Sequence, residues 1–130
     1  MKNEEVNDKK RIEKNRLQLI PKCEEYIQYS IEMINKLPRI EKFNIGNEYK
    51  KMMYKLLENI MYIQKMHVIN WITYLNKIDA LLNIQRCYLR VMYKNRYIDN
   101  KKFNVSIKYI LEMGQILGGL FKYYAKNNKK

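Results

Sequence analysis

The chain has 130 residues, the usual length of one domain, and carries a formal net charge of +13 from 26 basic and 13 acidic side chains. A charge of this size attracts polyanions, so the expected partner is nucleic acid or, as the alternative, an anionic membrane surface. The longest uncharged stretch, residues 66–76, is far shorter than the ~20 residues that span a bilayer, which excludes a transmembrane helix.

Residues that could carry chemistry are few. Cys23 and Cys87 are the only cysteines and form no Cys-x-x-Cys pattern, so the sequence predicts neither a disulfide framework nor a zinc site. One histidine and three acids after Glu58 are too few to converge on a reaction centre. We expect a cytoplasmic protein that is not an enzyme, with no catalytic residues, no cofactor and no metal ion.

The pattern of charge and hydropathy divides the chain into three parts. Residues 1–19 mix both signs of charge with few apolar positions and predict an arm that is either poorly ordered or helical. Residues 20–126 follow a helical period, and residues 127–130 form a basic tail. The short connections make neighbouring helices antiparallel, so the expected fold class is all-α, an up-down-up-down four-helix bundle.

The first expected helix runs over about 21–36, because proline is favoured in a first helical turn and Pro38 ends the segment. The second runs over about 46–67. The third, over about 68–96, has the most regular pattern, because its apolar stripe keeps helical spacing for six turns. The stripe consists of Trp71, Leu75, Ile78, Leu82, Gln85, Leu89 and Met92.

The fourth expected helix runs over about 101–126, with Asp99 and Asn100 as capping residues. Its inward face is expected to hold Phe103, Ile107, Ile110, Leu111, Gly114, Leu117, Gly118 and Phe121. A glycine in mid-helix costs about 1 kcal/mol relative to alanine, so a benefit must offset it. We expect Gly114 and Gly118 to let a neighbouring helix approach closely.

The third expected helix also carries a second apolar sector beside its core stripe. The members of this sector are Ala80, Leu81, Ile84, Cys87, Tyr88 and Val91. A helix in a monomeric bundle buries one stripe, so the additional apolar surface predicts an interface with another chain. The alternative is that the sector packs against the N-terminal arm of its own chain.

The polar edge of the same helix carries three basic side chains at intervals of four residues: Arg86, Arg90 and Lys94. Like charges at this spacing repel, so the row is favourable when phosphates bind it. We expect nucleic acid to contact this row together with Lys77 and Arg96, whereas the alternative is a solvated face partly paired with Asp79 or with acids of the first helix. No motif for sequence-specific readout is present, so binding should be mostly electrostatic, with nearby tyrosines available for base stacking.

Four segments, in this order and spacing, resemble a known family: Leu37-Pro38-Arg39, then Phe43-Asn44-Ile45-Gly46, then Asp79-Ala80-Leu81 with Arg86 and Leu89-Arg90, then Glu112-Met113-Gly114-Gln115-Ile116-Leu117-Gly118-Gly119. The family is that of the accessory variability determinant (Avd) proteins of diversity-generating retroelements. The resemblance covers about residues 20–124, and its most specific piece is the glycine motif of the last helix.

The resemblance implies a four-helix bundle that assembles as a homopentamer and binds RNA and DNA without evident sequence specificity. It also implies association with the reverse transcriptase of the element during mutagenic retrohoming, and a role for Arg86 and Arg90 in that work. A second family, the four-helix proteins encoded in intervening sequences of bacterial ribosomal-RNA genes, usually has Asn-Ile-Ala-Glu-Gly where residues 59–63 lack the Glu-Gly. A purely structural oligomer, or a bundle that adheres to membrane surfaces by charge, is the alternative from another class.

Overall fold

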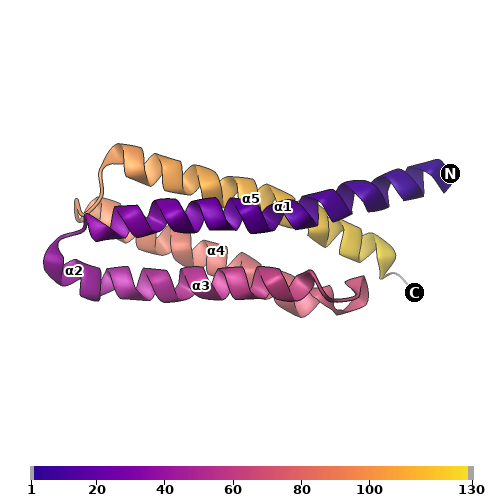
Figure 1. Ribbon diagram of the computed structural model, residues 1–130, viewed down its shortest axis with the longest axis horizontal. Helices are drawn as coiled ribbons and strands as arrows, with labels where there is room; N and C mark the ends of the chain where they lie inside the picture. Colours follow the sequence, from indigo (N-terminus) through magenta and orange to yellow (C-terminus); the bar gives the residue numbers. More distant parts are fainter. Residues whose placement is uncertain (1, 129–130) are drawn as a thin grey trace.

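The computed structural model describes residues 2–128, and four long antiparallel helices make up most of this part of the chain (Figure 1). The long helices are α1 (Lys2–Asn35), α3 (Ile45–Ile63), α4 (Trp71–Lys94) and α5 (Asn100–Asn127). A short helix α2 (Arg39–Phe43) lies between α1 and α3, and a 3-10 turn η1 (Val68–Asn70) precedes α4. The described residues contain no strand, and the predicted all-α four-helix bundle is confirmed.

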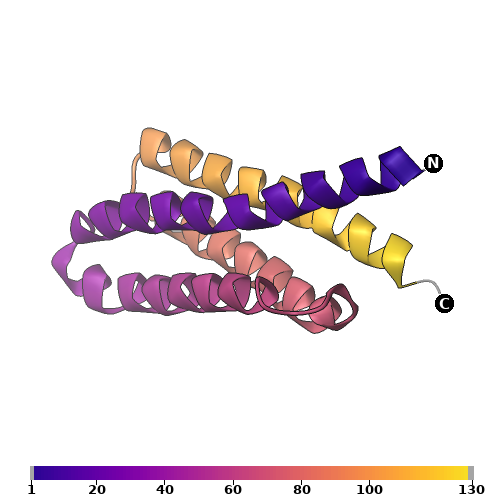
Figure 2. The same ribbon diagram turned by 45° about the vertical axis from the view of Figure 1, so that its right-hand side comes forward.

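Each long helix packs against two others: α1 and α4 each contact both α3 and α5. The α2 segment and the turn between α4 and α5 lie at one end of the bundle (Figures 1 and 2). The connection between α3 and α4 lies at the other end, toward which both chain termini point. None of the helices between residues 2 and 128 has an apolar stretch long enough to cross a membrane.

The core of the bundle is apolar and holds the stripe expected on the third helix. All seven of its residues are buried: Trp71, Leu75, Ile78, Leu82, Gln85, Leu89 and Met92. Gln85 is polar, and it is accommodated because Tyr26 donates to its Oε1 at 2.5 Å and its Nε2 donates to the Tyr49 carbonyl at 3.2 Å. Burial raises the pKa of Tyr26 and Tyr49, whose hydroxyl groups hydrogen-bond to each other. This hydrogen-bond network joins α1, α3 and α4 and fixes their positions relative to one another.

The first helix starts earlier than the sequence predicts. α1 begins at Lys2, and Pro21 lies inside it instead of at its start. A proline in mid-helix removes the hydrogen bond to the carbonyl four residues earlier, here that of Leu17. Leu17 and Pro21 are both exposed, so water can bind this carbonyl. Ile12 and Leu19 are buried in the core and hold the N-terminal half of the helix on the bundle.

The face that α5 turns toward the core also differs from the predicted one. Its buried residues are Ser106, Ile110, Met113, Leu117 and Leu120, whereas Leu111, expected inward, is 51% exposed. Phe103, Ile107 and Phe121 are half-buried beside this stripe. The helix is therefore rotated relative to the expectation, because burying Met113 and Leu120 removes more apolar area from water than burying glycines does. The predicted cap is confirmed, since the Asp99 side chain accepts a hydrogen bond from the Lys102 amide at 2.8 Å.

Candidate nucleic-acid interface

The basic row lies along the edge of α4 that faces α5. Arg86 is half-buried, its Nη1 donates to Asn83 at 2.6 Å, and its Nη2 lies 3.6 Å from where a Cβ on Gly114 would be. Arg90 and Lys94 are exposed, and Arg90 Nη2 lies 3.3 Å from the Cys87 sulfur. Residues four apart on a helix are separated by about 6 Å along its axis, so the three cations form one continuous row.

Lys77 does not belong to this row. It precedes Arg86 by nine positions, which at about 100° per residue places it on the opposite side of α4. Its Nζ lies 5.0 Å from the ring centroid of Tyr74, which in turn packs against Tyr62 of α3. The structure therefore brings Lys77 to the α3 side of the helix and separates it from the other predicted contacts.

Arg96 lies just past the end of α4 and has a φ of 62°, in the left-handed region that favours glycine. The Arg96 amide donates to the Tyr93 carbonyl at 3.0 Å, and the Tyr97 amide donates to the Met92 carbonyl at 2.9 Å. These two bonds form the Schellman motif that closes many helices. Arg96 therefore occupies the position where a glycine would be more stable.

We predict that Arg96→Gly raises the free energy of unfolding by about 1 kcal/mol, because it removes the strain of a side chain in the left-handed region. The same substitution should weaken nucleic-acid binding, because it deletes a cation of the interface. Urea denaturation and a binding assay on the same sample measure the two effects. A variant that gains no stability, or that binds as tightly as the parent, would contradict this interpretation of Arg96.

Beyond the end of α4, the row continues into a hollow of about 670 Å³ in the turn that leads to α5. The hollow is lined by Tyr93, Lys94, Arg96, Tyr97, Ile98, Asp99, Asn100 and Lys102. Tyr93 donates to Asn100 at 3.2 Å and its ring packs 4.7 Å from that of Phe103. The site thus combines cations with aromatic rings, the pairing that single-stranded nucleic acid needs for phosphate contact and base stacking.

Lys102 was missed by the sequence analysis. Its place in the hollow depends on the turn between α4 and α5, whereas residue spacing relates only positions within one helix. Asp99, an acid in the same wall, is the cap of α5 and its side chain accepts the Lys102 amide. Lys102 lies in the first helical turn after the predicted cap Asp99, and this position is the signal that could have placed Lys102 near the end of α4.

No acid neutralises the basic row within residues 2–128. The ion pairs of this part of the chain join Arg11 and Lys126 to Asp8, Arg16 to Glu13, Lys22 to Glu112, and Lys51 to Glu48. Asp79, the acid proposed as a partner of the row, takes part in none of them. The same residues contain no group of three or more His, Cys, Asp or Glu side chains placed to hold a metal ion.

The chain matches the model of a known protein family. The model of the bAvd-like family matches residues 17–124. The chain belongs to the bAvd-like family. No curated protein and no solved structure matches it.

The family match begins one residue after Arg16, so it covers most of the bundle and leaves out the N-terminal part of α1 before Leu17 and the last turn of α5. Within the matched region, α4 presents an exposed apolar face, which we define as Ala80, Ile84, Cys87 and Val91. Ile84 is 37% exposed and Val91 is 46% exposed. Leu81, which was expected in the same sector, is buried in the core, and Tyr88 is half-buried against the Tyr49 ring at 6.4 Å.

The apolar face of α4 is not covered by the chain's own N-terminal segment. α1 packs against α3 and α5, on the other side of the bundle. The alternative that the arm covers this sector is therefore wrong, and the face is open in the single chain.

The glycines of the family motif lie away from the tight contacts that the sequence predicted. A Cβ on Gly118 or Gly119 would meet no atom within 4 Å, and one on Gly114 would meet only Arg86. The prediction that Gly114 and Gly118 admit a neighbouring helix of the same chain is wrong. Met113 and Leu117 fill the core at these turns, and the glycines face outward or toward the basic row.

We therefore predict that Gly118→Ala raises the free energy of unfolding of the single chain by about 1 kcal/mol, the usual gain in helix propensity. Gly46→Ala is the matched control and should destabilise, because its Cβ would lie 3.0 Å from Ile34 and 3.2 Å from the Glu41 carbonyl. Chemical denaturation at low protein concentration measures both. Loss of stability in Gly118→Ala would mean that another molecule occupies the space beside this glycine.

Proposed function

We propose that this bAvd-like chain is a non-enzymatic, nucleic-acid-binding accessory subunit of a reverse transcriptase in a diversity-generating retroelement. Family membership supports the accessory role. The observation that carries nucleic-acid binding is the unneutralised row of Arg86, Arg90 and Lys94, which leads into a hollow lined by further cations and tyrosines. A row of this kind would be unfavourable unless it met a polyanion.

In this proposal, phosphates of RNA or DNA accept hydrogen bonds from Arg86, Arg90 and Lys94, with Arg96 and Lys102 binding the strand where it reaches the hollow. Tyr93 and Tyr97 offer rings to unstacked bases. Contacts to phosphates carry no sequence information, so different sequences should bind about equally well. The role in mutagenic reverse transcription would then be to hold template or product strands beside the enzyme.

We also propose that the chain works as a closed homo-oligomer, with the apolar face of α4 at the contact between subunits. A pentamer is the assembly that the resemblance to Avd proteins implies. Apolar side chains at Ile84 and Val91 contribute little to the single chain, in which they remain exposed. In the proposed oligomer these side chains would be buried between subunits, where they would stabilise the assembly.

Fluorescence anisotropy with labelled single-stranded RNA, single-stranded DNA and duplex DNA of unrelated sequences tests the proposed binding. We expect similar affinities for different sequences and a steep loss of affinity with salt. A protein that fails to bind all three at low salt, and instead sediments with anionic lipid vesicles, would favour the membrane-surface alternative. Co-purification with the reverse transcriptase of the same element tests the accessory role.

A further inference from the structure

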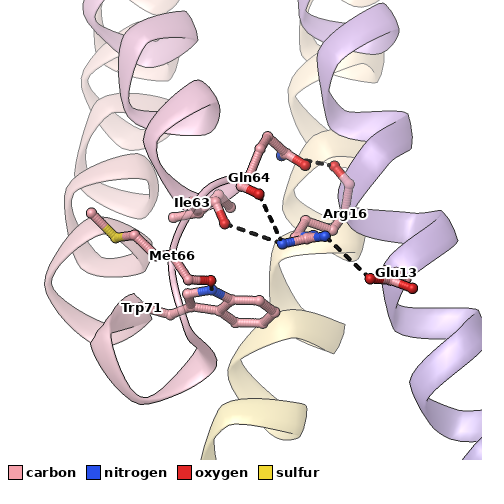
Figure 3. A network of polar contacts seen from close by, with 6 residues as sticks. All are labelled: Glu13, Arg16, Ile63, Gln64, Met66 and Trp71. Carbon is pink, nitrogen blue, oxygen red and sulfur yellow. Dashed lines mark hydrogen bonds and ion pairs between the residues drawn. The ribbon is translucent and has the colours of Figure 1, made fainter.

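At the end of the bundle opposite the basic row, Arg16 ties the N-terminal part of α1 to the end of α3 (Figure 3). Its Nη1 donates to the carbonyls of Ile63 and Gln64 at 3.4 and 3.3 Å, and its Nη2 pairs with Glu13 at 3.6 Å. Gln64 Nε2 donates to the Arg16 carbonyl at 3.1 Å. Arg16 of α1 thus donates to free carbonyls at the C-terminus of α3. This interaction holds the N-terminal half of α1 against the end of α3.

Beside this contact lies an open pocket of about 320 Å³, formed by parts of the chain that are far apart in sequence. Its walls come from α1, from the connection between α3 and α4, and from the end of α5. The lining residues are Lys9, Ile12, Glu13, Arg16, Met66, His67, Val68, Trp71 and Tyr123. The volume is at the lower end of the range of about 300–1,000 Å³ that holds small-molecule ligands, so it suits one compact ligand and not a strand.

The pocket wall has more basic than acidic groups. Lys9, Arg16 and His67 line it, against one acid, Glu13. Because Glu13 is paired with Arg16, it does not neutralise Lys9, which takes part in no ion pair between residues 2 and 128. The expected ligand is therefore an anion, and a phosphate group can accept hydrogen bonds from several of these basic side chains at once.

The other wall of the pocket is aromatic. Trp71 and Tyr123 lie with ring centroids 6.1 Å apart and planes tilted by 39°. Arg16 Cζ covers one face of Trp71 at 5.8 Å from its centroid, and the indole nitrogen donates to the Met66 carbonyl at 3.2 Å. Tyr123 is half-buried, so part of its ring is open to the pocket. A flat aromatic ring of a ligand can pack here while the charged group of the ligand meets the basic side chains.

We propose that this pocket binds a phosphorylated nucleoside, either free or at the 5′ end of a nucleic-acid strand, with the phosphate toward Lys9, Arg16 and His67 and the base against Tyr123. The site lies at the opposite end of the bundle from the basic row and extends the proposed function. It would add recognition of a single nucleotide to the sequence-independent contacts of α4.

Trp71 is the only tryptophan of the chain and lines the pocket, so its fluorescence reports on occupancy. Adenosine monophosphate is the probe, and we expect a saturable change in the Trp71 emission. Lys9→Ala should weaken this response about tenfold, the effect of losing one charge-assisted hydrogen bond. Tyr123→Leu, which keeps an apolar side chain but removes the ring, should weaken it as well. Lys10→Ala is the matched control, because it removes the same charge from the neighbouring position outside the pocket, and it should leave the response unchanged.

Two oligonucleotides of one sequence, with and without a 5′ phosphate, separate the two sources of the ligand. Tighter binding of the phosphorylated strand, lost in Lys9→Ala, assigns the pocket to strand ends. Equal binding of the two strands together with a response to adenosine monophosphate assigns it to free nucleotides.

The proposal is overturned if neither the mononucleotide nor the 5′ phosphate gives a response that depends on Lys9, or if Lys10→Ala weakens the response as much as Lys9→Ala. The double variant Arg86→Ala/Arg90→Ala should keep the Trp71 response. This variant and Lys9→Ala together distinguish failure of the pocket from failure of strand binding along α4.

Discussion

Ile84→Glu is expected to convert the proposed oligomer into folded monomers. The apolar face of α4 would lie between subunits, and a carboxylate placed there would lose its water without gaining a partner, which costs several kcal/mol at each contact. The single chain should tolerate the change, because Ile84 is 37% exposed in it. Sedimentation velocity measures the assembly, and circular dichroism checks that the helices persist. Leu17→Glu, at a 54% exposed position on α1, is the control and should leave the assembly intact.

The two cysteines give an independent measurement of the same interface. Burial raises the pKa of the Cys23 thiol to about 12, so this group should not react with maleimide in the folded protein. Cys87 is exposed in the single chain and lies on the apolar face. It should be protected in the wild-type assembly and react readily in Ile84→Glu. A wild-type protein that is monomeric at tens of micromolar, with a freely reactive Cys87, would contradict the proposed interface.

Arg86→Ala/Arg90→Ala should have the largest effect on nucleic-acid affinity. Each arginine is expected to contribute a charge-assisted contact to phosphate, so the double variant should bind RNA and DNA about a hundredfold more weakly, or roughly tenfold for each arginine. The control is Lys55→Ala/Lys77→Ala. It also removes two positive charges, one from an exposed position on α3 and one from the α3 side of α4, where Lys77 lies near Tyr74.

The control variant should bind much more tightly than the double arginine variant. If both variants lose affinity equally, the net charge of the protein and not the row determines binding. If the arginine variant instead dissociates into monomers, the row belongs to the subunit contact, and the assignment of the two sides of α4 is wrong. Sedimentation velocity on the same samples separates these outcomes.

The fold was accessible from the sequence because each long helix repeats its apolar residues with a helical period. α4 is the clearest case, since all seven predicted core residues are buried. The prediction was wrong where two signals competed at one position. Pro21 indicates a helix start, yet Ile12, which stands between two charged residues, and Leu19 are buried in the core and extend α1 to the N-terminal side of the proline. On α5, Gly114 and Gly118 were assigned to the core, one residue after Met113 and two residues before Leu120, the larger side chains that occupy it.

The sequence could predict the candidate interface only for residues that lie on one helix. The spacing of Arg86, Arg90 and Lys94 placed these residues on one edge of α4, whereas Lys77 is on the other side of the same helix. The hollow that contains Lys102 depends on the left-handed residue Arg96, a conformation that a period of hydrophobic residues does not encode. The pocket beside Arg16 is lined by residues as distant in sequence as Lys9 and Tyr123, and periodicity within single helices cannot reveal that they lie together.

The dependence of affinity on salt tests the central claim, that the basic row of α4 neutralises phosphates, most directly. Binding of one labelled RNA is measured from about 50 to 200 mM salt for the wild-type protein and for Arg86→Ala/Arg90→Ala. Each lost phosphate contact lowers the slope of log affinity against log salt by roughly 1, so the two slopes should differ by about 2. Equal slopes for the two proteins would contradict the claim, because the phosphates would then be bound elsewhere on the surface.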